Sequence, residues 1–126
     1  MQASWNDNQP IYRQLRDKVI ASILDQELKE GDALPSVRQV SADFQLNPIT
    51  VSKAYQELVD EELVEKRRGV GMFIQSGARN RLLTKERSQF LEHEWPLILE
   101  RIERLGLNVS ELFENATGKS QGESNE

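Results

Sequence analysis

Apolar residues between positions 37 and 58 recur at three- and four-residue intervals, which predicts two helices joined by a short turn. The first helix is expected to begin after Ser36, because Ser36 with Gln39 three residues later matches a capping box. The second is expected to begin after Asn47, which precedes a proline at the first helical position. One face of this second helix is predicted to be buried and contains Val51, Ala54, Tyr55 and Leu58.

The opposite face of the second helix is mostly polar and lies near its N-terminus. It presents Ile49, Thr50, Ser52, Lys53 and Gln56. A helix that packs one side on a core and offers its first turn outward is typical of a recognition helix in a DNA major groove. An ordinary helical hairpin fits the same pattern, so these two helices alone leave both interpretations open.

A β-hairpin is predicted directly after the second helix, because two β-prone runs bracket Arg68-Gly69-Val70-Gly71. Its end carries three consecutive cations, Lys66, Arg67 and Arg68. A solvated hairpin with incidental charge is the simplest interpretation of the hairpin alone. A basic hairpin after a helix-turn-helix pair is more specific and indicates a wing that contacts phosphates and the minor groove.

The N-terminal part is expected to complete one domain over residues 1–77. Residues 1–8 are predicted to be loose, and a helix over residues 10–26 is predicted to bury Leu15, Val19, Ile20, Ile23 and Leu24. Ala33-Leu34 is expected to pair with the hairpin as a third strand. The domain boundary is predicted at residues 76–78.

A long helix from residue 79 or 80 to about Leu105 is predicted beyond this boundary, with Gly106 as its stop. It carries two apolar stripes, of which one is expected to pack on the chain's own domain and the other on a second copy. Pro96 predicts a bend over residues 92–95. The stripes consist of Leu91, Trp95, Ile98, Ile102 and Leu105 at paired-helix spacing, and of Leu83, Phe90 and Leu97.

A final helix is predicted from Val109, capped by Ser110 or by the rival Asn108, and it adds Leu112 and Phe113 to the apolar cluster. Residues 78–116 would form a helical dimerisation unit. Residues 117–126 are polar and are predicted to be disordered.

The order of these elements resembles the GntR family of bacterial transcription regulators, and the short C-terminal part most resembles its YtrA-like subfamily. The resemblance is carried by residues 10–15, 31–38, 47–55 and 68–73. It implies a mainly helical fold with a β-hairpin wing and a sequence-specific DNA-binding regulator, a repressor. The two-fold symmetry of the homodimer expected from the apolar stripes predicts an inverted-repeat operator. The resemblance also implies control of a transporter operon. Gln26 and Glu62 stand where the family usually has glycine, which questions the geometry of those two loops.

Helix geometry and the resemblance together assign a DNA-binding surface. Arg38 resembles the family arginine that reaches the groove or its wall, with an exposed ion pair as the alternative. Ser36 and Asn47 are caps that can also contact phosphate. Ile49 is a candidate for contact with a thymine methyl group. The complete predicted surface is Ser36, Arg38, Asn47, Pro48, Ile49, Thr50, Ser52, Lys53, Arg67, Arg68 and Gly69.

Composition excludes several other classes of protein. The chain has 126 residues and a net charge of −5, so any DNA affinity depends on the local placement of cations rather than on the overall charge. Without cysteine, and with the solvated His93 as its one histidine, it offers no catalytic pair, metal site or cofactor site. No apolar run is long enough for a membrane span, and no signal peptide is recognised, so a cytoplasmic location is expected.

Two functional questions remain open from the sequence. A winged helix can also bind RNA or dock on another protein. The part after residue 78 is too small for an enclosed pocket, so an effector would bind at the dimer interface or between domains, and its identity is unknown.

Overall fold

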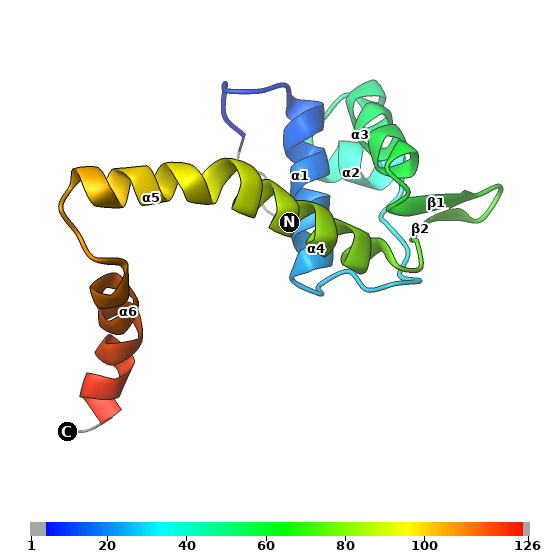
Figure 1. Ribbon diagram of the computed structural model, residues 1–126. Coiled ribbons are helices and arrows are strands. Elements are labelled where there is room, and N and C mark those ends of the chain that lie inside the picture. Colours follow the sequence, from blue (N-terminus) through cyan, green and yellow to red (C-terminus); the bar gives the residue numbers. More distant parts are fainter. Residues whose placement is uncertain (1–4, 125–126) are drawn as a thin grey trace. The chain divides into compact units, whose positions relative to one another are not determined.

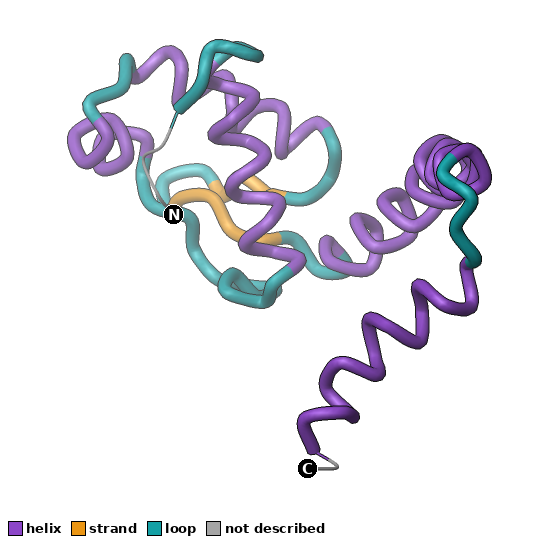
Figure 2. Tube along the Cα trace, turned by 90° about the vertical axis from the view of Figure 1, so that its left-hand side faces the viewer, coloured by secondary structure: helices purple, strands orange, loops and turns teal. Residues whose placement is uncertain are grey.

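The computed structural model describes residues 5–124 and is mainly helical, with one two-stranded antiparallel hairpin in the described part (Figures 1 and 2). This confirms the predicted fold class. The chain forms two compact units that divide between Lys85 and Glu86, within one helix. The elements are α1 (Ile11–Leu24), α2 (Val37–Phe44), α3 (Pro48–Asp60), β1 (Val64–Arg67), β2 (Gly71–Ile74), α4 (Ala78–Gln89), the π-helical turn η1 (Phe90–Glu94), α5 (Trp95–Arg104) and α6 (Val109–Ser124).

The core of the N-terminal unit forms where the apolar stripes of α1 and α3 meet. The predicted stripe of α3 is confirmed, since all four of its residues are buried. The stripe of α1 is buried except at Leu24, which is only partly covered, and α1 ends there rather than at residue 26. Because the two stripes face each other, α3 has one covered side and one side that is free for contacts outside the domain.

Both predicted helix starts are capped by side chains. Ser36 Oγ accepts a hydrogen bond from the Gln39 backbone N–H at 3.0 Å, and Asn47 Oδ1 accepts one from the Ile49 N–H at 2.8 Å. Each cap satisfies a backbone donor that a helix leaves without a partner. Gln45, at φ 54°, ends α2 and begins the turn toward α3.

The hairpin has the predicted position and turn. Arg67 pairs with Gly71, so residues 68–70 form the turn, and Gly69 takes φ +76°, which glycine adopts without strain. The predicted pairing of Ala33-Leu34 with the hairpin is present, since the Leu34 N–H donates to the Met72 carbonyl and the Ile74 N–H donates to the Asp32 carbonyl, each at 2.8 Å. The paired piece is short and forms a single bridge, between Ala33 and Phe73, rather than a full strand.

The two positions where family glycines are absent keep the left-handed backbone. Gln26 has φ 63° and Glu62 has φ 61°. A non-glycine residue pays roughly 1–2 kcal/mol for this conformation. The loop geometry is therefore retained, at a cost in local strain.

The segment before α1 is held in place by contacts with α1 and α2. The side chain of Gln14 accepts from the Asn6 N–H at 2.9 Å and donates to the Asn6 carbonyl at 2.8 Å. The ring edge of Trp5 packs on Phe44 with the centroids 6.2 Å apart. The prediction of a loose segment is therefore wrong for residues 5–8, while residues 1–4 lie outside the described part.

The first half of α4 belongs to the N-terminal unit, so the predicted boundary at residues 76–78 is too early. Ala78 and Leu82 are buried in the core. The guanidinium of Arg81 donates to the backbone carbonyls of Glu62, at 2.6 Å, and of Ser76, at 2.9 Å. These contacts bind the start of α4 to the hairpin region.

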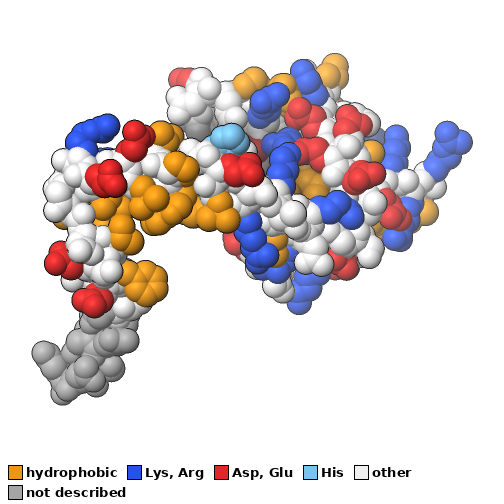
Figure 3. Space-filling view, in the orientation of Figure 1, with side chains coloured by type: hydrophobic (Ala, Val, Ile, Leu, Met, Phe, Trp, Pro, Cys, Tyr) orange, Lys and Arg blue, Asp and Glu red, His pale blue; other side chains and the backbone are white. Residues whose placement is uncertain are grey.

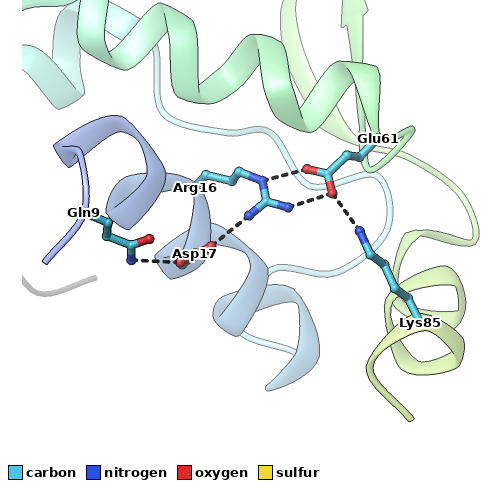
Figure 4. Close-up of polar contacts among 5 residues, drawn as sticks. All are labelled: Gln9, Arg16, Asp17, Glu61 and Lys85. Atoms are coloured by element: carbon cyan, nitrogen blue, oxygen red, sulfur yellow. Dashed lines mark hydrogen bonds and ion pairs between the residues drawn. The ribbon is translucent and has the colours of Figure 1, made fainter. Parts of the chain in front are cut away.

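An ion-pair network joins α1, the end of α3 and α4 (Figure 4). Arg16 donates to both carboxylate oxygens of Glu61, from Nε and from Nη2, each at 2.7 Å. Lys85 Nζ reaches Glu61 Oε1 at 3.3 Å, and Arg16 Nη1 also contacts Asp17 at 2.9 Å. The hydrogen bonds from Arg16 lower the pKa of Glu61 below its ordinary value, and Glu61 in turn raises the pKa of Arg16.

The C-terminal unit begins within α4 and contains the predicted irregularity. The π-helical turn interrupts the helix over residues 90–94, just before Pro96, so the single long helix of the prediction is divided. Gly106, at φ 69°, follows the end of α5 as predicted.

The last helix differs from the prediction at both ends. Asn108 is its cap, since Asn108 Oδ1 accepts from the Ser110 N–H at 2.8 Å, and Ser110 is not. The backbone of α6 is helical to Ser124, where the sequence predicted a disordered tail from residue 117. A local hydrogen bond from Thr117 Oγ1 to the Phe113 carbonyl accompanies this extension. Residues 125–126 lie outside the described part.

Replacing Glu61 by glutamine should lower the free energy of unfolding by about 1 kcal/mol at neutral pH, because two charge-assisted hydrogen bonds are weakened at a largely covered site. A carboxylate whose pKa is lowered by folding stabilises the protein above its unfolded pKa, which is about 4.3. This stabilisation is lost as the pH falls through the lower folded value. Urea unfolding at several pH values should therefore show the difference between parent and variant shrinking toward acid pH.

Glu65→Gln is the matched control, because Glu65 forms an ion pair with Arg67 that is about half exposed. Its effect should stay within about 0.5 kcal/mol at every pH. A Glu61→Gln difference that does not change between neutral and acid pH would contradict the role given to this pair.

Candidate nucleic-acid interface

The N-terminal turns of α3 present an uncovered surface. Ile49 is 75% exposed although it is apolar, and Pro48, Ser52 and Lys53 are also exposed, while Thr50 is half-buried. Each of these residues lies where the sequence predicted it, away from the buried stripe. The predicted recognition face is therefore accessible.

Arg38 lies in the first turn of α2 and is exposed. Its alternative role was an ion pair with a neighbouring carboxylate. Within the part of the chain that the structure describes, no acidic group lies within ion-pair distance of Arg38. Its guanidinium is thus available for a contact outside the domain.

Tyr55 connects α3 to the segment that leads into α2. Its ring is buried in the core, as predicted, and its hydroxyl donates a hydrogen bond to the Pro35 carbonyl at 2.7 Å. Burial raises the pKa of Tyr55 to about 12, so the hydroxyl keeps its proton and stays a donor. This bond fixes the relative position of the two elements that carry the predicted DNA contacts.

The cations at the end of the hairpin differ in their surroundings. Arg67 Nε contacts Glu65 Oε1 at 2.7 Å, and its guanidinium lies 4.2 Å from the centroid of the Phe73 ring. Lys66 and Arg68 are exposed and have no ion pair with a described residue. Lys and Arg side chains project at the end of the hairpin in Figure 3. Arg68 and Gly69 therefore match the predicted wing contact better than Arg67 does.

Two residues beside the predicted surface were not assigned from the sequence. Val70, between the two hairpin glycines, is 70% exposed at the end of the wing. Tyr12 lies in the first turn of α1, and Lys53 Nζ is 4.1 Å from the centroid of its ring. Tyr12 is part of a run that carries the family resemblance, but its contact with α3 joins residues 41 positions apart, which no local pattern reveals.

Other kinds of site find no support in the described residues. They contain no group of three or more His, Cys, Asp or Glu side chains placed to hold a metal ion. None of their helices is long and apolar enough to cross a membrane. The features that stand out in this unit are instead an exposed helix N-terminus and a basic hairpin.

This combination defines a winged helix-turn-helix protein, a class that places the second helix of the pair in a DNA groove. Residues 11–74 match the model of the gntR family of bacterial regulatory proteins, and the chain belongs to this family. It is a DNA-binding transcription regulator rather than an enzyme. This membership favours the DNA-binding interpretation over the RNA-binding and protein-docking ones.

Three similar proteins support this assignment. The uncharacterized HTH-type transcriptional regulator YhcF of Bacillus subtilis is 32% identical and covers 97% of this chain and 99% of its own. The HTH-type transcriptional repressor YtrA of Bacillus subtilis is 37% identical over 72% of this chain and 70% of its own. A solved GntR family regulator from Listeria monocytogenes superposes with a TM-score of 0.72 at 25% identity, covering 90% of this chain and 98% of its own.

Replacing Tyr55 by phenylalanine should lower the free energy of unfolding by about 1–2 kcal/mol, because the Pro35 carbonyl loses its donor while the ring still fills the core. Urea unfolding measures this effect. Tyr12→Phe is the matched control, because no described residue forms a hydrogen bond with its hydroxyl, and it should change stability by less than about 0.5 kcal/mol. Equal effects of the two substitutions would contradict the role of the Tyr55 hydroxyl.

Proposed function

We propose that this regulator is a repressor that binds an inverted-repeat operator as a homodimer, with α3 in the major groove and the hairpin on the adjacent backbone or minor groove. The exposed N-terminal face of α3 carries this proposal, because it combines an apolar tip at Ile49 with hydrogen-bonding and cationic side chains. Such a surface can read methyl groups and base edges. The term repressor rests on the name of the YtrA relative. Control of a transporter operon rests only on the resemblance to the YtrA-like subfamily.

Dimerisation is proposed for the C-terminal unit, because its apolar side chains have no core to enter. None of the residues of η1 or α5 is buried. Figure 3 shows apolar side chains gathered along α5. Exposed apolar surface of this kind marks an interaction site in a soluble protein. The residues proposed for the dimer contact are Leu91, Trp95, Ile98, Ile102, Leu105, Leu112 and Phe113, of which Leu91 and Leu105 are each 60% exposed and Phe113 is 70% exposed.

The second predicted stripe is also accessible, since Phe90 is 41% and Leu97 is 63% exposed. The two exposed apolar stripes lie on adjoining faces and together offer a broad surface on which a second copy of the chain can pack. A two-fold dimer presents two recognition helices in opposite orientations, so its preferred site is an inverted repeat whose half-sites lie on one side of the duplex.

Arg38→Ala should weaken binding to an operator selected from random duplex DNA by about 1–3 kcal/mol. It should also reduce the preference for the correct base at one position of each half-site. The measurement is a titration of operator duplexes carrying each base at each position. Arg87→Ala, which removes an exposed cation from α4, is the control for the loss of one positive charge. An Arg38→Ala protein that binds every duplex like the parent would refute the assignment.

Replacing Arg67 and Arg68 together by alanine should weaken DNA binding and make its salt dependence shallower. Each lost phosphate contact lowers the magnitude of the slope of log affinity against log salt by about 0.9. Titrations at several salt concentrations measure this slope. The double variant Lys29→Ala, Arg87→Ala removes the same charge elsewhere and should leave the slope nearly unchanged, so equal slopes in the parent and the wing variant would count against a wing contact.

Ile98→Glu should shift the protein toward monomers, because it places a charge within the proposed apolar contact. Sedimentation equilibrium should give a dimer for the parent and a monomer for the variant at the same micromolar concentration. Glu103→Gln changes the net charge by one unit, with the opposite sign, on the side of α5 that faces away from both stripes, and should stay dimeric. An Ile98→Glu protein that remains dimeric would contradict the assigned dimer contact.

A further inference from the structure

The side chain of Lys53 is held by the first turn of a different helix. Its Nζ atom lies 4.1 Å from the centroid of the Tyr12 ring, which is within the range of a cation–π interaction. Tyr12 is the second residue of α1, while Lys53 lies on the accessible side of α3. Tyr12 is half-buried and Lys53 is exposed, so the ring is the more fixed of the two partners.

The neutral partner leaves the charge of Lys53 available. Arg67, another cation of the predicted interface, is instead paired with the Glu65 carboxylate at 2.7 Å. In the described part of the chain, no carboxylate lies within ion-pair distance of Lys53. An aromatic face attracts an ammonium group without cancelling its charge, so the N–H donors of Lys53 that point away from the ring can still approach an anion.

Restraining the side chain of Lys53 favours its contact with a DNA phosphate. A lysine side chain has a flexible four-carbon stem and loses much conformational freedom when it binds a phosphate. A ring that already limits these conformers reduces the loss on binding, which is the basis of preorganisation. The ring also holds the ammonium beside the first turn of α1.

We propose that Tyr12 is a positioning residue that holds Lys53 against a backbone phosphate at the edge of the major groove. The interface then extends beyond the helix-turn-helix and the wing to the first turn of α1. This inference rests on the proposed function, because it requires that the accessible side of α3 faces DNA. The inference goes beyond the proposed function, because it states that a contact already present in the free protein positions Lys53 for DNA.

The contact itself is tested without DNA. Ring currents of Tyr12 should shift the Lys53 ε-methylene protons upfield in the NMR spectrum of the free dimer. The shift should disappear in Tyr12→Leu and persist in Tyr12→Phe, which keeps the aromatic face. An unshifted Lys53 signal in the parent protein would overturn the proposal.

Its consequence is tested by a double-mutant cycle on operator binding, with Tyr12→Leu, Lys53→Met and the double variant. Tyr12→Leu should weaken binding two- to fivefold, which is equivalent to about 0.4–1 kcal/mol. Tyr12→Phe should stay within about 1.5-fold of the parent, because the ring interaction is retained. In the Lys53→Met background, Tyr12→Leu should have no further effect, since the side chain that it positions is absent.

The salt dependence separates the two roles. Lys53→Met should reduce the magnitude of the salt slope by about 0.9, as for one lost phosphate contact, while Tyr12→Leu should leave it unchanged. A Tyr12→Leu effect that is equally large with and without Lys53 would overturn the positioning role. If Lys53→Met changes neither affinity nor slope while the NMR shift is present, the proposed DNA contact of Lys53 fails and the positioning role fails with it.

Discussion

The division of α3 into a buried and an uncovered face is the constraint on which the N-terminal unit depends. Val51, Ala54 and Leu58 are fully buried, so α3 cannot rotate about its axis without exposing them. The Tyr55 hydroxyl adds a directional bond to Pro35. Because the buried face is fixed in this way, the opposite face is fixed too, and Ile49 and its neighbours are presented to solvent at a defined angle.

The positive charges available to DNA are a few exposed side chains, whereas the chain as a whole is negatively charged. The protein carries a net charge of −5, yet Arg38, Lys53 and Arg68 are exposed and have no ion pair within the described residues. At the far end of α3, the Glu61 carboxylate is occupied, since it accepts from Arg16 and Lys85. An overall negative charge weakens non-specific attraction to DNA, so binding depends on sites where these few cations all find phosphates or bases.

Most of the fold and the candidate surface could be predicted from the sequence, because helix periodicity, the caps at Ser36 and Asn47, and the hairpin glycines are local signals. Contacts between distant segments could not. The bond between Arg16 and Glu61 and the stacking of Lys53 on Tyr12 each select one partner from many similar side chains. The choice between Asn108 and Ser110 as a cap failed for a related reason, since both residue types cap helices and stand only two positions apart.

The most direct test of the account is the spacing dependence of operator binding by the intact protein. Sites are first selected from random duplex DNA, and the half-sites are then separated by about 5 or about 10 additional base pairs. Two linked recognition helices predict an inverted repeat whose binding is lost when one half-site turns to the opposite side of the duplex and partly recovers after a full turn. A selected site without an inverted repeat, or equal affinity at every spacing, would contradict a dimer that binds one duplex through two α3 helices.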